Sequence, residues 1–207
     1  MRKLLYIACI FNLFGLFAQN QHDQNINALI EQYSKKPELK CEIIVQIDVE
    51  GMQIPDKKLI VDFQKDKKPK VKSEGLSLLP KKGTIDQFGK LLSSPFQAIY
   101  LSKSGNNLAY KLVSLDPKSD WITADIIFDE NSYVIYRSTV NTRKFGSFQA
   151  DHSYKENIYP FRSIITFDVK KFKIPLKFIG REQGVASSIP DKEKNIQGKI
   201  TLIYTYL

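Results

Sequence analysis

Hydrophobic residues recur with a helical period in two short segments of the chain. In NINALIEQYSKK the apolar positions fall at i, i+3, i+4 and i+7, the spacing of an amphipathic helix. The apolar face of this predicted helix holds Ile26, Leu29, Ile30 and Tyr33. In PKKGTIDQFGKLLSS, Thr84 and Gln87 have the spacing of a capping box, and Pro95 ends the segment. The apolar side of this second predicted helix holds Ile85, Phe88, Leu91 and Leu92.

Elsewhere apolar and polar residues alternate, as they do in β-strands with one buried face. The first alternating segments predict a hairpin, with a strand from Cys41 to Val49, a turn over 51–56 and a returning strand KKLIVDF. Short extended pieces are expected at 70–73 and 76–79. After the second helix the pattern predicts a meander of strands at 96–102, 108–115, 121–129, 132–142, 147–154, 162–169 and 198–207.

Alternation in these strands gives the predicted sheet one face rich in aliphatic and aromatic side chains. Examples are Leu108, Tyr110 and Leu112 on one strand, Ile122, Ala124, Ile126 and Phe128 on the next, and Val134, Tyr136 and Val140 on a third. An antiparallel sheet with one apolar face must close on itself, pair with a second sheet or be covered by helices. Only two short helices are predicted, so we expect them to plug or lid a curved sheet. Such a fold leaves room for an apolar cavity.

The N-terminal segment has the layout of a secretory signal peptide. Arg2 and Lys3 precede an apolar run from Leu4 to Phe17, and small Ala18 follows. We expect cleavage near Ala18 and export, so that residues 1–18 are the signal and 19–207 form one domain. Cys41 is then the only cysteine, which excludes an internal disulfide.

A formal net charge of +9 indicates that the protein binds an anionic partner. Export favours anionic lipid or polysaccharide over nucleic acid. The densest basic stretch is KDKKPKVK, residues 65–72. It suits a solvated turn whose lysines discourage edge-to-edge strand pairing. The alternative is a patch facing an anionic membrane, where each lysine contributes about 1 kcal/mol of attraction.

The acidic residues from Asp116 to Glu130 do not have the spacing of a reactive site. In DPKSDW, Lys118 and Trp121 occupy positions where a calcium loop needs Asp or Asn and then Gly. Asp125 and Asp129 are four residues apart on one strand, about 13 Å, which exceeds the roughly 5–9.5 Å of a glycosidase pair. We therefore interpret LDPKSDW as a turn that Asp116 and Pro117 begin.

Residues for nucleophilic or metal chemistry are few. The histidines are His22, near the N-terminus, and His152, which alternation places with Phe148 and Ala150. No G-x-S-x-G elbow, C-x-x-C pair, H-x-x-x-H pair or phosphate-binding glycine loop accompanies them. We predict no catalytic residue, no metal and no cofactor, and interpret His152 as a packed or partly exposed strand residue.

The order of these segments resembles the LolA-like family of periplasmic outer-membrane lipoprotein carriers, also called lipoprotein-sorting proteins. After the signal peptide and the first helix, the resemblance lies in IIVQIDVEGMQIPDKKLIVDFQKDKKPKVKSEG, in LLPKKG with its short helix, and in YKLVSLDPKSDWITADIIFDENSYVIYRSTVNTRKFGSF. It covers residues 26–207. It implies a mainly β (α+β) fold, in which a strongly curved antiparallel sheet forms an incomplete barrel closed by short amphipathic helices.

The resemblance also implies a monomeric carrier without enzymatic activity, which holds acyl chains in an apolar cavity. The cargo would be a lipoprotein or another acylated lipid, passed in the periplasm from an inner-membrane donor towards an outer-membrane acceptor. Cavity positions are Val45, Val61, Phe63, Tyr110, Leu112, Ile126, Phe128, Tyr136, Leu202 and Tyr204. The lid helix would contribute Ile85, Phe88, Leu91 and Leu92. A basic residue holding lipid carbonyls is not aligned here, because Arg137 alternates with Tyr136, and the segment 181–195 has no counterpart.

Two other functions remain open on sequence grounds. One is an envelope structural or interaction protein whose apolar face is packed without a ligand. The other is a secreted hydrolase that uses His152 or the acids between Asp116 and Glu130.

Overall fold

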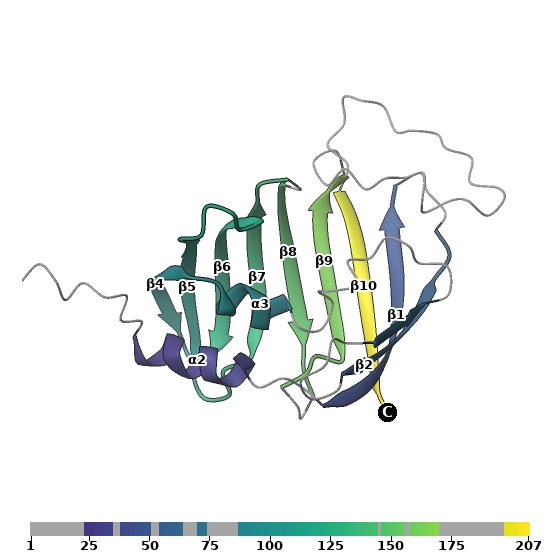
Figure 1. The fold of residues 1–207 in the computed structure, drawn as a ribbon, viewed down its shortest axis with the longest axis horizontal. Coiled ribbons are helices and arrows are strands. Elements are labelled where there is room, and N and C mark those ends of the chain that lie inside the picture. Colours follow the sequence, from purple (N-terminus) through teal and green to yellow (C-terminus); the bar gives the residue numbers. More distant parts are fainter. Residues whose placement is uncertain are drawn as a thin grey trace, which may run out of the picture.

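A ten-stranded antiparallel sheet is the main feature of the computed structural model, which describes residues 23–34, 38–50, 54–63, 70–73, 87–144, 146–155, 158–169 and 197–207. Its strand order is β3-β2-β1-β10-β9-β8-β7-β6-β5-β4 (Figure 1). The strands are β1 (Leu39–Val49), β2 (Lys57–Phe63), β3 (Lys70–Ser73), β4 (Phe96–Ser104), β5 (Asn107–Ser114), β6 (Trp121–Asp129), β7 (Ile135–Thr142), β8 (Gly146–Ser153), β9 (Arg162–Asp168) and β10 (Gln197–Tyr206). The helices are α2 (Gln24–Ser34) and α3 (Gln87–Ser93).

Strands β4 to β9 form the predicted meander, each paired antiparallel with the next. The tight β4–β5 connection places Gly105 at φ 58°, a left-handed conformation that costs glycine little. Strand β7 begins at Ile135, later than predicted, because residues 130–133 form a turn. The Asp129 carboxylate accepts the backbone N–H of Asn131 at 3.0 Å and that of Ser132 at 2.8 Å.

The last strand, β10, pairs with the first strand, β1. It lies between β9 and β1, in a register that runs from Cys41↔Tyr206 to Val49↔Gly198. Gly198 faces the ring of Phe167 on β9 so closely that a Cβ atom built there would lie 2.5 Å from Phe167 Cζ. The absence of a side chain at Gly198 therefore allows Phe167 to pack across β10.

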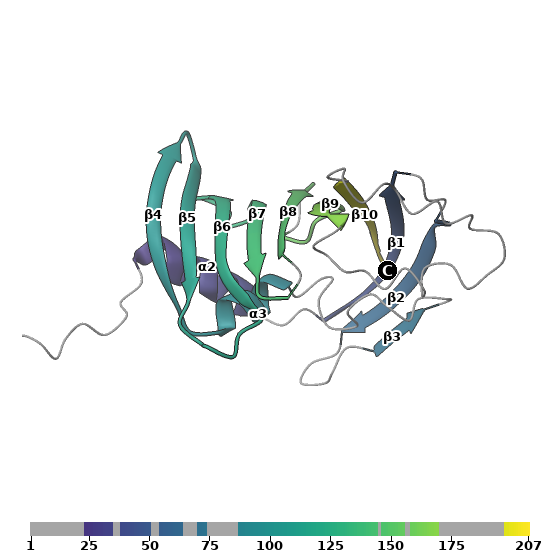
Figure 2. The same ribbon diagram turned by 90° about the horizontal axis from the view of Figure 1, so that it is seen from above.

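The sheet curls, but within the described ranges it does not close. Strands β3 and β4 are its two edges. From above, the strands from β10 through β1 and β2 to β3 wrap round one end of the sheet (Figure 2). The predicted fold class, a curved antiparallel sheet forming an incomplete barrel with short helices, is confirmed.

Two hydrophobic clusters line the inner face of this sheet. The first joins α2 and α3 to strands β4–β7, and the second joins β1, β2, β9 and β10. Phe148 on β8 packs against both clusters, so the apolar surface is continuous along the sheet. The helices α2 and α3 lie over the part of the sheet that carries the first cluster (Figure 1).

The predicted first helix is confirmed as α2. Asp23 precedes it, and its Oδ1 atom accepts the N–H of Ile26 at 2.9 Å, as an N-cap does. No helix within the described ranges is long and apolar enough to span a membrane. Several predictions fall outside the described residues: the signal peptide 1–18, the strand at 76–79, the Thr84 cap, Ile85 and the segment 181–195.

Candidate functional site on the inner face of the sheet

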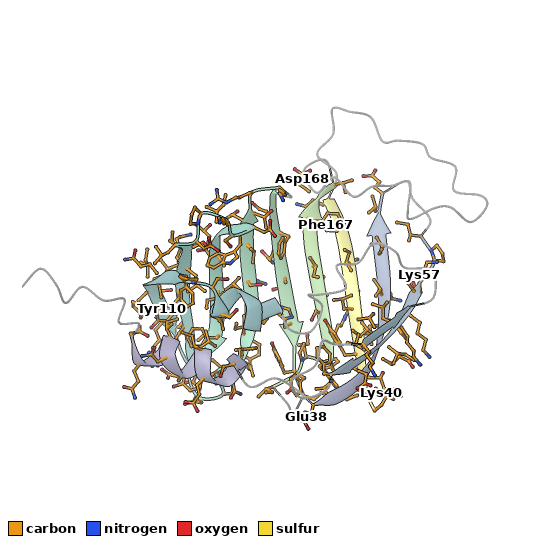
Figure 3. All side chains as sticks on the ribbon, in the orientation of Figure 1. Glu38, Lys40, Lys57, Tyr110, Phe167 and Asp168 are labelled. Carbon is orange, nitrogen blue, oxygen red and sulfur yellow. The ribbon has the colours of Figure 1, made fainter. Side chains whose placement is uncertain are left out.

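The β4–β7 part of the inner face consists of large apolar side chains beneath the two helices. Tyr110, Leu112, Ile126 and Phe128 are buried there, at the positions that alternation predicts. The rings of Tyr110 and Phe128 stack with centroids 5.6 Å apart. Tyr110 lies between the sheet and α2 (Figure 3). This half is therefore an apolar layer held between strands and helices.

The β1–β2–β9–β10 half carries the other predicted cavity residues. Val45, Val61, Leu202 and Tyr204 are buried in the second cluster, and Phe63 packs against it. Cys41 belongs to the same cluster, and burial raises the pKa of its thiol to about 11, so the thiol stays protonated at neutral pH. The inner surface of this half is thus also apolar.

A buried polar link lies on the inner face where the two halves meet. His152 on β8 is 5% exposed, and its Nδ1 atom lies 2.8 Å from Oγ of Ser163 on the neighbouring strand β9. Ser163 also hydrogen bonds with Tyr204 on β10. Burial lowers the pKa of His152 to about 4, against a smaller opposing effect of the Asp151 carboxylate, so the imidazole is neutral at pH 7. The link connects three adjacent strands through neutral groups.

Helix α2 is fastened to the sheet by polar contacts near both ends. The hydroxyl of Tyr110 donates to Asp23 Oδ2, while the other oxygen of Asp23 caps the helix. Near the opposite end, the hydroxyl of Tyr33 accepts the backbone N–H of Ile135 at 3.1 Å. The hydroxyl of Tyr154 donates to the carbonyl of the same Ile135 at 2.8 Å. The contacts of Asp23 and Tyr33 fix the position of α2 along the strands.

Helix α3 meets the sheet through apolar side chains. Phe88, Leu91 and Leu92 are buried in the first cluster. The ring of Phe88 packs edge-on against His152, with centroids 5.1 Å apart, and against Tyr33 of α2 at 5.5 Å.

The prediction that Tyr136 belongs to the buried apolar face is wrong. Tyr136 is 41% exposed, and its ring packs edge-on against Tyr154 at 5.7 Å. The β6–β7 register shifts here, so that Phe128 pairs with Ile135 and Ile127 with Arg137. This β-bulge makes Tyr136 an extra residue, and Ile135 takes the buried position instead. Arg137 is exposed and forms an ion pair with Asp151.

The prediction that Ile122 lies on the buried apolar face is also wrong, because of a second β-bulge. The register shifts between Trp121 and Thr123, which leaves Ile122 41% exposed and Trp121 buried in the first cluster. Strict alternation cannot anticipate either bulge, because a single inserted residue reverses the expected side of its neighbours.

The acidic residues of LDPKSDW form the predicted turn. Asp116 accepts the N–H of Lys118 at its carboxylate, 2.8 Å away, and that of Ser119 at its carbonyl, 3.0 Å away. Asp125 forms an ion pair with Lys111 on the adjacent strand. The hydrogen bonds from Ser132 lower the pKa of Asp129. In the described part of the chain, no group of three or more His, Cys, Asp or Glu residues is placed to hold a metal ion.

These elements define a class of architecture, an open antiparallel half-barrel with an apolar inner face and two helices packed on it. Neither a scan against protein-family models nor a search of curated proteins finds a match to this chain. Solved structures similar to it include a LolA superfamily protein from Nitrosomonas europaea, with 8% identity, a TM-score of 0.47 and coverage of 87% of this chain and 91% of the other. A domain from Vibrio parahaemolyticus, described as an outer membrane lipoprotein-sorting protein, has 9% identity, a TM-score of 0.42 and coverage of 87% and 91%.

A DUF1329 family protein from Desulfovibrio piger is similar to the same extent, with 6% identity, a TM-score of 0.45 and coverage of 87% of this chain and 90% of the other. The descriptions of the first two structures contain the words LolA superfamily and lipoprotein-sorting protein.

Sequence reasoning missed three features of the inner face. They are the pairing of His152 with Ser163, the fastening of α2 through Asp23 and Tyr33, and the inward turn of Trp121. Alternation carried part of the signal, since it already placed His152 on the apolar side. The partners of these residues lie up to 102 positions away in sequence, and only strand register and helix placement bring them together.

Proposed function

We propose that this chain is a periplasmic carrier that binds the acyl chains of lipoproteins or other acylated lipids between the inner face of its sheet and helix α3. The observation that carries the proposal is the extent of the apolar inner face. It continues through Phe148 from the first cluster, under the helices, into the second, which contains no residue of α2 or α3. An acyl chain gains about 0.8 kcal/mol for each methylene that leaves water for such a surface.

The contacts of α3 support a role as the moving lid. Phe88, Leu91 and Leu92 occupy the apolar surface that an acyl chain would take. When an acyl chain displaces these side chains from the sheet, its methylene groups make apolar contacts in their place. The free energies of the open, loaded form and of the closed, empty form would therefore be similar. Helix α2, fastened by Asp23 and Tyr33, would stay in place.

The proposed carrier acts passively and is not an enzyme. Its partners would be an acylated cargo, an inner-membrane donor and an outer-membrane acceptor, with an anionic membrane surface near the lysine-rich β2–β3 segment, and it would act as a monomer. The buried, neutral His152–Ser163 pair suits a structural link between strands better than a nucleophile and its base, because Ser163 is 1% exposed.

One observation favours a second candidate, an envelope interaction protein without a lipid ligand. Leu112, Ile126 and Phe128 expose no surface, so protein atoms already pack around them. In that case the inner face is an ordinary core, and the exposed residues of the protein carry its function.

Lipid content distinguishes the two functions. For a carrier, native mass spectrometry of protein purified from the periplasm should show added lipid mass, and delipidated protein should take up a fluorescent acyl lipid from vesicles. A Phe88→Ala variant, which loosens α3, should exchange that lipid several-fold faster. Leu101→Ala is the matched control, since Leu101 is 49% exposed on β4. Protein that carries no lipid and takes none up would instead support the packed interaction protein.

A further inference from the structure

The indole N–H of Trp121 is a buried hydrogen-bond donor without an acceptor among the described residues. Its Nε1 atom exposes less than 1 Å² of surface, and the whole residue is 8% exposed. Indole nitrogen can only donate, and a buried tryptophan N–H normally finds a partner because leaving it unpaired is costly. An orphaned donor in an otherwise apolar cluster therefore indicates a missing acceptor.

The location of Trp121 suits the head of a bound chain. It begins β6 directly after the turn that contains Asp116, so it lies at one end of the inner face. Its ring lies 6.5 Å from that of Phe96, which follows the last residue of α3 by three positions. Helix α3 lies beside β7 in both ribbon views (Figures 1 and 2). Trp121 and the buried residues of α3, Phe88, Leu91 and Leu92, belong to the same hydrophobic cluster.

The rest of β6 offers a track for hydrocarbon. From Trp121 the inner face continues through Ala124 and Ile126, both buried and apolar, over about 16 Å at the rise of a β-strand, as far as Phe128, whose ring stacks on Tyr110 at α2. Ala124 is small and lies between Leu112 and Val140 on the neighbouring strands, next to the indole along the strand. A long acyl chain could lie along this track with its carbonyl group at Trp121.

We propose that the indole N–H of Trp121 donates a hydrogen bond to the carbonyl oxygen that links an acyl chain to its headgroup. This proposal rests on the proposed function, because it assumes that acylated molecules enter the inner face. It adds the chemical group that the site recognises: an ester or amide carbonyl, as opposed to hydrocarbon alone. This single hydrogen bond would determine how far the acyl chain extends along β6.

The test compares ligands that differ only at that group. Delipidated protein is titrated by calorimetry with palmitoyl lysophosphatidylglycerol and with its hexadecyl ether analogue, which lacks the carbonyl. N-palmitoylglycine, which has an amide carbonyl in place of the ester, shows whether the site accepts an amide as well as an ester. We expect the ether to bind about 5- to 10-fold more weakly than the ester. Trp121→Phe keeps an aromatic ring without the N–H and should remove this preference, while the control Phe96→Leu should retain it.

A spectroscopic measurement makes the test independent of the variants. Trp121 is the only tryptophan in the chain, so its indole N–H gives a single ¹H–¹⁵N resonance. The ester should move the indole proton downfield, and the ether should not. Equal binding of ester and ether with an unmoved indole resonance overturns the role of Trp121 and leaves lipid binding intact. The role is also overturned if the indole proton of the lipid-free protein already has the chemical shift of a hydrogen-bonded N–H. Failure of every ligand to bind overturns the proposed function itself.

Discussion

Acid should destabilise this protein through His152 at a pH above the range in which Asp129 and Asp151 titrate. The imidazole is buried between Phe88 of α3, Tyr154 and Ser163, and this burial lowers its pKa to about 4, from 6.5 in an unfolded chain. The Asp151 carboxylate, the charged group acting on it, opposes the shift only in part. Because the unfolded state takes up the proton first, stability is complete above pH 6.5 and falls as the pH drops from 6.5 towards 4.

The size of the loss follows from the two pKa values. At about 1.4 kcal/mol for each tenfold change in proton affinity, the free energy of unfolding should fall by about 2 kcal/mol between pH 7.5 and pH 5, and by about 3 kcal/mol below pH 4. The lowered pKa values of Asp129 and Asp151 place their own contributions below pH 4. The interval from pH 7.5 to 5 therefore lies above the range in which these two aspartates contribute.

Urea unfolding at pH 7.5, 6 and 5 measures this loss in the natural protein and in His152→Gln, which keeps a neutral side chain able to hydrogen bond with Ser163. We expect the variant to lose at least 1 kcal/mol less stability between pH 7.5 and 5. Because His152 contacts Phe88, the protection factors of amides in α3, which correct for the slower intrinsic exchange in acid, should also fall at pH 5 in the natural protein. Equal losses in the two proteins, or an NMR titration of His152 with a midpoint near 6.5, would refute the reasoning.

Three further substitutions test individual contacts. Gly198→Ala forces a Cβ atom into the ring of Phe167 and should lower the free energy of unfolding by about 1–3 kcal/mol, measured in urea; an unchanged value would contradict the close packing of the two strands. Tyr33→Phe leaves the Ile135 N–H without its acceptor and should cost about 1–3 kcal/mol, with faster amide exchange at the end of α2; unaltered exchange would show that this bond does not hold the helix. Tyr136→Ser should leave lipid uptake within about twofold of the natural protein, since the bulge removes this residue from the buried face; a large loss of uptake would restore it to the site.

The residues of the inner face could be predicted from the sequence in stretches of strand that contain no β-bulge, where every second side chain points to the same face. Leu112, Ile126 and Leu202 occupy every-second apolar positions of their strands, and each is buried as expected. The prediction failed at Tyr136 and Ile122, because each adjoins a bulge, and a bulge depends on how two strands pair. Local alternation holds no information about that pairing.

The sequence by itself determined the helices, most strands and the apolar face, since these depend on residues within one or two turns or along one strand. Tertiary structure alone decided that β10 pairs with β1, that His152 meets Ser163, and that the indole of Trp121 is buried without an acceptor among the described residues. The physical reason is range: hydrophobic periodicity is local, whereas a hydrogen bond across strands is fixed by register. The features that bear most directly on function in this chain belong to the second kind.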